Sequence, residues 1–487
     1  MENHGAAPRD DAPRSKRLKV TRRKRVHWLY TSHRLLMWNR ERFRTNPKEL
    51  NDPLRNTMAC MARGELMGVS IADQGSTSKV NAFVLAWVAA LAFYFLEYYS
   101  RSAPAVMIPE LSSAFGVTAL GVSSILGFYY YTYSATSLVA GALLDRFGAK
   151  FVVPSGMAIL GIGCILFAVP DKFMGDTGRL LQGAGSAFAF TGAVYLASHG
   201  FSASRLATAV GLTQCVGMLG GTVGQALTGH LIHGILSVSG FWLALGVTTL
   251  VCGVLLLVIT PKEVLQSPKK GGGSGLLDTY KIVFTNPQSY LCGAVAGLLF
   301  VPTTIGDMVW GVSFFQQDKM FSYQSAVFAA SMVPLGWVFG CPLLGWIADK
   351  LQRRKPALAG GILVMLVCAI QLVYLPALAP AWVTLLIFGI ASGAAMIPYT
   401  IIKEANPDHV KGSATGGINF LTFGVTAFIG PIYARQFGKT LGIKTISPLN
   451  HFNHAALFWV LIIALAFIVS LALKETGMGK ASTRNVR

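Results

Sequence analysis

From Val80 onward, the chain alternates between apolar runs and short polar loops. Each run approaches the roughly 20 apolar residues that an α-helix needs to cross the hydrocarbon core of a bilayer. The pattern predicts twelve transmembrane helices, at about residues 80–99, 119–144, 151–169, 177–199, 207–233, 240–260, 288–316, 323–347, 356–375, 380–402, 412–434 and 454–473. Only 13% of the residues are charged, whereas soluble chains contain about 25%. The composition therefore excludes a disordered protein, a coiled coil and a typical soluble enzyme.

The PKKGGGSG sequence at 268–275 divides these helices six and six, and its Gly and Ser residues are typical of a flexible linker. We therefore expect an all-α membrane protein with two six-helix, pseudo-symmetric halves. The expected regions are an N-terminal extension (1–78), a first half (79–260), a cytoplasmic linker (261–287), a second half (288–474) and a cytoplasmic tail (475–487).

The N-terminal extension is strongly basic. Residues 1–78 carry 16 Lys/Arg and 8 Asp/Glu, so they contribute +8 of the formal net charge of +20. The basic run at 13–25 could be a nucleic-acid patch or a targeting signal, or simply part of a solvated, disordered tail. Translation that begins at Met67 would leave out residues 1–66, which include this basic run. We expect a disordered extension and no nucleic-acid partner.

The basic residues of the helical body predict its orientation. With both termini on the cytoplasmic side, seventeen Lys/Arg lie in cytoplasmic loops and five in outer loops. This bias satisfies the positive-inside rule. We expect a monomeric, multi-pass protein of the cell (inner) membrane, with the lipid bilayer as its surroundings.

Two loops repeat at equivalent places in the halves. The loop after the second helix reads GALLDRFGAK (141–150), and the loop after the eighth reads GWIADKLQRR (345–354). Both have a Gly, then an Asp four residues later, followed by basic residues. Two related six-helix halves predict a transport pathway between them.

These loops resemble the signature of the major facilitator superfamily. The first motif consists of Gly141, Asp145, Arg146, Gly148 and Lys150, and its weaker repeat of Gly345, Asp349, Lys350, Arg353 and Arg354. Arg179, Gln182 and Gly183 in the fourth predicted helix resemble a second family motif. The resemblance covers about residues 80–474. It implies the major facilitator fold, alternating access, and a loop charge cluster that latches the outward-open state.

The residues of the first loop motif also have a physical interpretation of their own. Gly141 lets a neighbouring helix approach closely, and Asp145 can cap the next helix. Arg146 and Lys150 hold the loop on the cytoplasmic side. The alternative is a basic loop with a purely topological role.

Within this superfamily, the first helix is most similar to the sugar-phosphate permease and anion:cation symporter branch. Arg101 lies eight residues before Pro109, and the resemblance implies an anion-binding role for that Arg. Phosphate-binding members carry a second Arg in the seventh helix, where this chain has Asp307 instead. A monoanion, a zwitterion or a small peptide therefore fits better than a doubly charged organophosphate.

Glu97 and Arg101 are the most informative charged residues, because a charge at the centre of a membrane costs about 2.5–3.5 kcal/mol on insertion scales. They are four residues apart with Glu first, the favourable order for a helical pair. Arg101 could bind a carboxylate or a phosphate, and Glu97 could be its protonatable partner. The alternative is a structural pair that neutralises itself.

Further candidates lie on several helices. We expect Tyr130, Gln214, Trp310 and Asn419 to bind substrate, although polar stripes of this kind also hold helices together. Asp307 is the second candidate for proton coupling, unless it merely reaches water. Arg179 near the outer end of its helix could instead be a snorkelling anchor.

The function that these residues predict is secondary transport of a small organic solute, coupled to a proton. The solute would be an organic acid, an amino acid or a small peptide. Electroneutral anion exchange of the sugar-phosphate type and neutral-sugar transport are the alternatives. We expect no enzyme activity and no cofactor, because the sequence shows no hydrolase triad, phosphate-binding loop or dinucleotide fingerprint. We expect no metal site, because the Cys and His residues lack the spacing of a ligand set.

Overall fold

The computed structural model describes residues 65–201, 203–262, 276–317, 320–373, 378–407, 410–441 and 448–477. The basic run at 13–25, the glycine-rich sequence at 268–275 and residues 478–487 lie outside them, so the predictions for these segments stay predictions. Contacts divide the chain into Met1–Ser76 and Thr77–Arg487. The described part of the second unit contains helices and no strand, as the sequence predicts.

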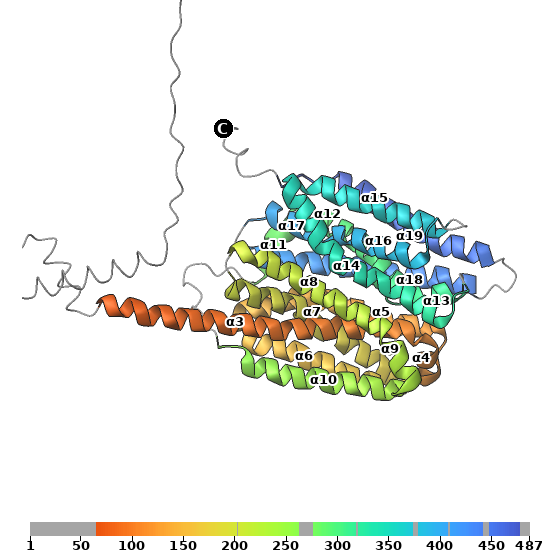
Figure 1. The fold of residues 1–487 in the computed structure, drawn as a ribbon, viewed down its shortest axis with the longest axis horizontal. Helices are drawn as coiled ribbons and strands as arrows, with labels where there is room; N and C mark the ends of the chain where they lie inside the picture. The colour runs from red at the N-terminus through yellow and green to blue at the C-terminus, as the bar shows by residue number, and fades with distance from the viewer. Residues whose placement is uncertain are drawn as a thin grey trace, which may run out of the picture. The chain divides into compact units, whose positions relative to one another are not determined.

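The first predicted half contains eight helical segments of regular α type (Figure 1). These are α3 (Glu65–Ser102), α4 (Ile108–Phe115), α5 (Ala119–Phe147), α6 (Ala149–Phe167), α7 (Lys172–Gly200), α8 (Ala203–Ala226), α9 (Thr228–Gly234) and α10 (Val238–Ile259). Helix α3 begins well before residue 80, because helical hydrogen bonding continues into the polar sequence that precedes the apolar run.

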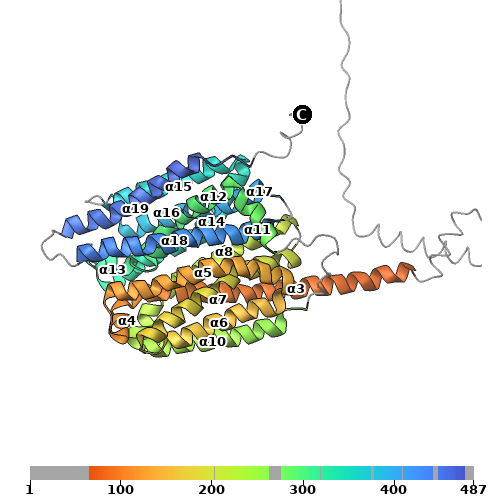
Figure 2. The same cartoon turned by 180° about the vertical axis from the view of Figure 1, so that it is seen from behind.

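The part of the chain that follows the glycine-rich sequence begins with α11, which falls in the expected linker and precedes the second predicted half. Its segments are α11 (Leu276–Thr285), α12 (Pro287–Val301), α13 (Gly311–Gln317), α14 (Tyr323–Leu351), α15 (Arg354–Val373), α16 (Ala381–Ser392), α17 (Ile397–Ala405), α18 (Lys411–Leu441) and α19 (Pro448–Leu471). Figure 2 shows these helices gathered beside those of the first half, with α18 next to α5.

All twelve predicted segments fall on helices, and three of them fall on two or more consecutive ones. Within the described residues, nine helices are long and apolar enough to span a membrane, or ten if the bent pair α4–α5 is one span. The shorter apolar stretch Leu457–Leu471 belongs to α19. The all-α membrane architecture is thus confirmed.

Polar residues cap the N-termini of four helices. Thr118, Asp171, Ser237 and Ser322 each accept a hydrogen bond from the backbone N–H three residues later. Such caps satisfy an N–H group that has no partner within the helix. They fix where each span enters the bundle.

Three spans contain a break in the regular α-helix. Helix α3 passes into the 3₁₀ segment η1 (Ala103–Val106), and α16 passes into η3 (Gly393–Met396). Between α12 and α13 lies η2 (Pro302–Asp307), a π-helical turn in which the N–H of Met308 donates to the carbonyl of Thr303 at 2.9 Å. Helical breaks of this kind free backbone groups and change the direction of side chains.

Close helix contact in the first half depends on Gly183 of α7. A Cβ at this position would lie 2.1 Å from the carbonyl oxygen of Tyr129 on α5. Only glycine allows the two backbones to approach this closely. Gly183 of the second family motif therefore sets where Tyr129 stands.

Candidate functional site

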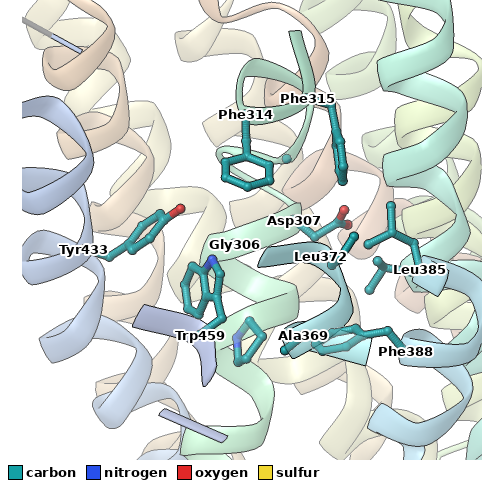
Figure 3. Close-up of a pocket in the computed structure, with 13 residues that line it drawn as sticks. Gly306, Asp307, Phe314, Phe315, Ala369, Leu372, Leu385, Phe388, Tyr433 and Trp459 are labelled. Carbon is teal, nitrogen blue, oxygen red and sulfur yellow. The ribbon is translucent and has the colours of Figure 1, made fainter. Parts of the chain in front are cut away.

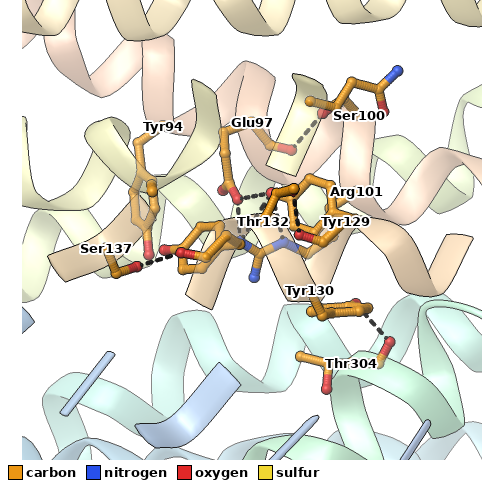
Figure 4. A network of polar contacts seen from close by, with 12 residues as sticks. Tyr94, Glu97, Ser100, Arg101, Tyr129, Tyr130, Thr132, Ser137 and Thr304 are labelled. Carbon is orange, nitrogen blue, oxygen red and sulfur yellow. Dashed lines mark hydrogen bonds and ion pairs between the residues drawn. The ribbon is translucent and has the colours of Figure 1, made fainter. Parts of the chain in front are cut away.

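The centre of the first half contains a hydrogen-bonded cluster of Glu97, Arg101 and Tyr129, which we call the Arg101 cluster (Figure 4). Arg101 Nη2 forms an ion pair with Glu97 Oε1. The Tyr129 hydroxyl accepts hydrogen bonds from Arg101 Nε at 3.2 Å and Nη2 at 3.1 Å, and donates to the same Glu97 oxygen. The helical spacing on α3 and the register of α5 thus bring three polar groups together.

Aromatic rings surround the guanidinium. Arg101 Cζ lies 4.4 Å from the ring centroid of Tyr98, 5.0 Å from Tyr129, 4.9 Å from Tyr133 and 5.2 Å from Phe423. Cation–π attraction compensates part of the cost of removing the charge from water. Arg101 is only 1% exposed and Glu97 0%, so the cluster is closed to solvent in this conformation.

One edge of the guanidinium remains available. Within the described part of the chain, Arg101 Nη1 and Glu97 Oε2 make no hydrogen bond although both atoms are buried. Buried polar atoms without partners are costly and uncommon. The cluster therefore combines a tightly held cation with an unused donor that could bind an anionic oxygen.

Arg179 and Gln182 hold the end of α3 in place. Arg179 Nη1 donates to the carbonyl of Ser100 at 3.1 Å and to Gln182 Oε1 at 2.5 Å, and Nη2 donates to the carbonyl of Arg101 at 3.4 Å. Arg179 is 1% exposed, so it is buried in the bundle and does not snorkel to a surface. It supports the backbone of Arg101 where α3 gives way to η1.

The other predicted substrate contacts are all buried within the bundle. The Tyr130 hydroxyl donates to the carbonyl of Thr304 at 2.9 Å, across the two halves. Gln214 Oε1 accepts from Tyr94 at 3.0 Å, and Asn419 Oδ1 accepts from Tyr399 at 2.8 Å. Trp310 is buried after η2. Tyr130 thus links the helix that carries Tyr129 to the seventh predicted helix.

Several aromatic members of the site were not among the predicted residues. They are Tyr94, Tyr98, Tyr129, Tyr133, Tyr399 and Phe423. The sequence did contain a signal for some of them, because residues 94, 98 and 101 share a helix face by their spacing, as do 129 and 133. Phe423 comes from α18, and no local pattern points to it.

Asp307 lies elsewhere, at the end of the π-helical turn η2, and lines a separate cavity (Figure 3). Its Oδ2 accepts a hydrogen bond of 3.1 Å from Gln225 Nε2 of α8. The side chain is 6% exposed. The two predicted proton-coupling residues therefore occupy different environments.

The first loop motif is tied to the end of a neighbouring helix. Lys150 Nζ donates to the carbonyls of Leu257 at 3.0 Å and Thr260 at 2.7 Å, at the C-terminal end of α10. A cation there complements the helix dipole. The described contact of Arg146 is with the ring of Phe147.

The structure gives little support for the predicted roles of Asp145 and Gly141 in this motif. The side chain of Asp145 lies outside the described residues, so its capping role stays a prediction. A Cβ at Gly141 would lie 3.6 Å from the Tyr280 hydroxyl, which is an ordinary van der Waals distance. The structure therefore does not require glycine at this position for close helix approach.

In the second motif, carboxylates tie the loop to neighbouring helices. Arg354 pairs with Asp349 at 2.6 Å and with Glu404 at 2.9 Å. Lys350 lies over the ring of Trp346, and a Cβ at Gly345 would meet no atom within 4 Å. The loop thus has an internal ion pair and a tie to α17.

Glu475, which the sequence did not single out, completes this motif. Arg353 pairs with Glu475 at 3.7 Å. Partial burial raises the pKa of Glu475, but hydrogen bonds from the backbone N–H groups of Arg354, Gly477, Lys355 and Thr476 outweigh it, so the pKa is lowered. Glu475 therefore joins the end of the last span to the start of α15.

Comparison with known proteins identifies the family of this chain. The family model described as the Major Facilitator Superfamily matches residues 90–431. The chain belongs to the major facilitator superfamily. It is therefore a multi-pass membrane transporter of small molecules and not an enzyme.

Several transporters are similar to this chain at low sequence identity. The rat MFS-type transporter SLC18B1 is 24% identical over 435 residues, which cover 84% of this chain and 90% of the relative. The probable galactarate/D-glucarate transporter GudP of Escherichia coli (strain K12) is 22% identical over 413 residues, with 77% and 91% covered. A probable hexose phosphate transport protein of Chlamydia muridarum is 22% identical over 299 residues, with 54% and 63% covered.

Among solved structures, a bacterial homologue of the human lysosomal transporter Spinster has the same fold. It superposes with a TM-score of 0.62 at 15% sequence identity, and the match covers 80% of this chain and 97% of that one. This likeness supports the major facilitator fold that the loop motifs predicted.

Proposed function

We propose that this transporter moves a small organic anion or zwitterion by alternating access, coupled to a proton, and that Arg101 binds the anionic group of the solute. The observation that carries the proposal is the buried guanidinium whose Nη1 edge has no partner in the described residues. A carboxylate or phosphate oxygen on that edge would satisfy the donor and balance the charge.

The proposed solute carries one negative charge at this site, because the second buried arginine is already used. Arg179 donates to two backbone carbonyls and to Gln182. The described part of the seventh predicted helix contributes no further arginine. Organic monocarboxylates, amino acids and small peptides therefore lead. The names of the GudP and hexose phosphate relatives favour an anion as well.

The proposed coupling passes through Glu97. In the cluster, Glu97 shares one carboxylate oxygen between Arg101 and Tyr129. An anion that takes over Arg101 would leave Glu97 buried without its cation, and the carboxylate would then bind a proton. Binding of anion and proton are thus linked, and the linkage is reciprocal. Asp307 is the second candidate for the proton.

A screen for ligands tests the anion proposal. Purified protein is heated with organic monocarboxylates, amino acids, sugar phosphates and neutral sugars, because a ligand of the folded state raises the unfolding midpoint. We expect anions to raise the midpoint in the parent and not in Arg101→Gln. Stabilisation by neutral sugars alone would overturn the proposal and favour a sugar transporter.

Proteoliposomes test the coupling with the ligand that the screen identifies. We expect Glu97→Gln to lose accumulation driven by a pH gradient and to retain exchange of solute across the membrane. If Glu97→Gln accumulates solute like the parent, Glu97 does not couple the proton. The hexose phosphate relative favours one alternative, electroneutral anion exchange, and a parent that ignores the pH gradient would establish it.

We further propose that the protein is a monomer in the cell (inner) membrane with both termini in the cytoplasm. The excess of basic residues in the proposed cytoplasmic loops supports this orientation. Protease protection of tags at the two termini in intact cells would test it, and cleavage from outside would contradict it.

A further inference from the structure

We propose that the cavity beside Asp307 is a binding site for an organic ammonium group. This Asp307 cavity lies in the second half, separate from the Arg101 cluster. The proposal rests on the proposed function in one respect: it concerns a ligand of the same transporter. It adds a positively charged group to the anionic group already proposed for Arg101. Its own support comes from different residues.

The cavity is small, aromatic and almost entirely apolar. Its volume is about 60 Å³, which is room for one small group. The aromatic side chains that line it are Phe314, Phe315, Phe388, Tyr433 and Trp459. Figure 3 shows them around the carboxylate, with Leu372 and Leu385 beside it. Several spans therefore contribute to a site with one acidic group.

Among the residues that the structure describes, the carboxylate of Asp307 has no cationic partner. Its described side-chain partner is the amide of Gln225 at 3.1 Å, and no described Lys, Arg or His lies within ion-pair distance of it. A buried, unpaired charge is far more costly than a paired one. By contrast, Glu97 has an arginine of the same chain beside it. The Asp307 cavity has the anion of a pair and space for the cation.

The lining decides which cation fits. Calcium, magnesium and similar hard ions require several oxygen ligands, and this cavity supplies one carboxylate among hydrocarbon and aromatic walls. Aromatic faces attract organic ammonium ions, and a carboxylate accepts hydrogen bonds from an N–H⁺ group. An ammonium group therefore matches both parts of the lining.

Two glycines near Asp307 let groups that line the cavity pack closely against the backbone. A Cβ at Gly306 would lie 2.9 Å from the ring of Trp459, and a Cβ at Gly311 would lie 3.0 Å from Asp307 Oδ1. A proton alone needs no cavity next to the carboxylate. The cavity that Asp307 lines therefore favours a bound group larger than a proton.

The cavity is connected to the first half through η2. Thr304, whose carbonyl accepts the Tyr130 hydroxyl, and Asp307 belong to the same π-helical turn. The ammonium group could thus belong to a zwitterion that also engages Arg101, or to a separate organic cation. Both sources share the chemistry proposed for the cavity, and the experiment distinguishes them.

The test measures thermal unfolding of the purified full-length protein in methylammonium chloride, against sodium chloride of equal concentration. We expect methylammonium to raise the unfolding midpoint of the parent in a saturable manner. Asp307→Asn should abolish the rise. Gly311→Ala should also abolish it, because its methyl group occupies the space beside Oδ1 while the carboxylate remains.

A matched control is Gly360→Ala on α15, where an added Cβ would meet no atom within 4 Å; it should respond like the parent. Should Asp307→Asn fail to fold, Gly311→Ala still decides. A parent midpoint that rises no more in methylammonium than in sodium chloride would overturn the proposal. So would an undiminished rise in Gly311→Ala.

Arg101→Gln separates the two sources and keeps this test distinct from that of the proposed function. β-Alanine and methylammonium are compared on this variant. If one zwitterion bridges both sites, the effect of β-alanine is lost in Arg101→Gln and in Asp307→Asn. If the cation is separate, any effect of β-alanine persists in Arg101→Gln and is lost only in Asp307→Asn. In both cases methylammonium still stabilises Arg101→Gln, even if no anion binds to the protein.

Discussion

The first span of each half contains a buried carboxylate where its helix is interrupted, but the two carboxylates have opposite surroundings. Glu97 has an ion pair with Arg101 and a hydrogen bond from Tyr129. Asp307 has one amide donor and an apolar cavity. The first is compensated by the protein itself, whereas the second has no cationic partner among the described residues. The comparison shows that similar positions in a two-half transporter can have complementary chemistry.

The largest expected effect comes from breaking the compensated pair. Arg101→Met leaves Glu97 buried without its cation, which should destabilise the protein by about 3–5 kcal/mol and abolish anion binding. The double variant Glu97→Gln/Arg101→Met should recover most of the stability and none of the binding. Thermal unfolding and ligand-induced shifts measure both effects. A double variant as unstable as Arg101→Met would show that charge compensation is not what holds the cluster together.

The second largest expected loss of stability is steric and comes from substitution of Gly183. In Gly183→Ala, the added methyl group overlaps the carbonyl oxygen of Tyr129, 2.1 Å away. Overpacking of this kind costs about 1–3 kcal/mol, and displacement of Tyr129 should also weaken anion binding at Arg101. The matched control is Gly127→Ala on α5, where the new Cβ meets no atom within 4 Å. Equal stability and binding in the two variants would argue against close α5–α7 packing as the support of Tyr129.

Removal of the Asp307 carboxylate should change the stability in the opposite direction from removal of the Glu97 carboxylate. Asp307→Asn removes a buried charge that has no cationic partner among the described residues, so at neutral pH we expect stability to stay level or rise by about 1 kcal/mol. Glu97→Gln, which leaves Arg101 unpaired, should lower stability in the same assay. The contrast between the halves fails if both substitutions destabilise the protein equally.

The smallest expected effect is the pH dependence of stability that comes from Glu475. The pKa of Glu475 is lowered in the folded protein because backbone N–H groups donate to its carboxylate. A carboxyl with a lowered pKa stabilises the fold above its unfolded-state pKa, and this contribution is lost as the pH falls through the acidic range. We expect less than about 1 kcal/mol from this partly exposed site.

Unfolding of Glu475→Gln and the parent across the acidic range measures this contribution. The variant should be less stable at neutral pH and converge with the parent under acid. A constant difference at all pH values would assign the effect to lost hydrogen-bond geometry and not to the carboxylate charge.

Local sequence patterns determined the helices and the central ion pair. Apolar length alone placed all twelve segments on helices, because a chain in a bilayer has to cover its thickness with apolar side chains. The spacing of four residues between Glu97 and Arg101 brought them together on α3, because this is the repeat of the helix surface. The loop motifs identified the family, and the family match confirmed it.

Tertiary packing decided what surrounds these residues. Tyr129 reaches the ion pair from α5, Phe423 reaches it from α18, and Glu404 and Glu475 reach the second loop motif from distant positions in the chain. The Asp307 cavity exists only where several spans meet. A sequence records spacing along one helix, whereas a cavity depends on the distances between helices. Those distances were set by close contacts such as Gly183 against Tyr129, which no single segment encodes.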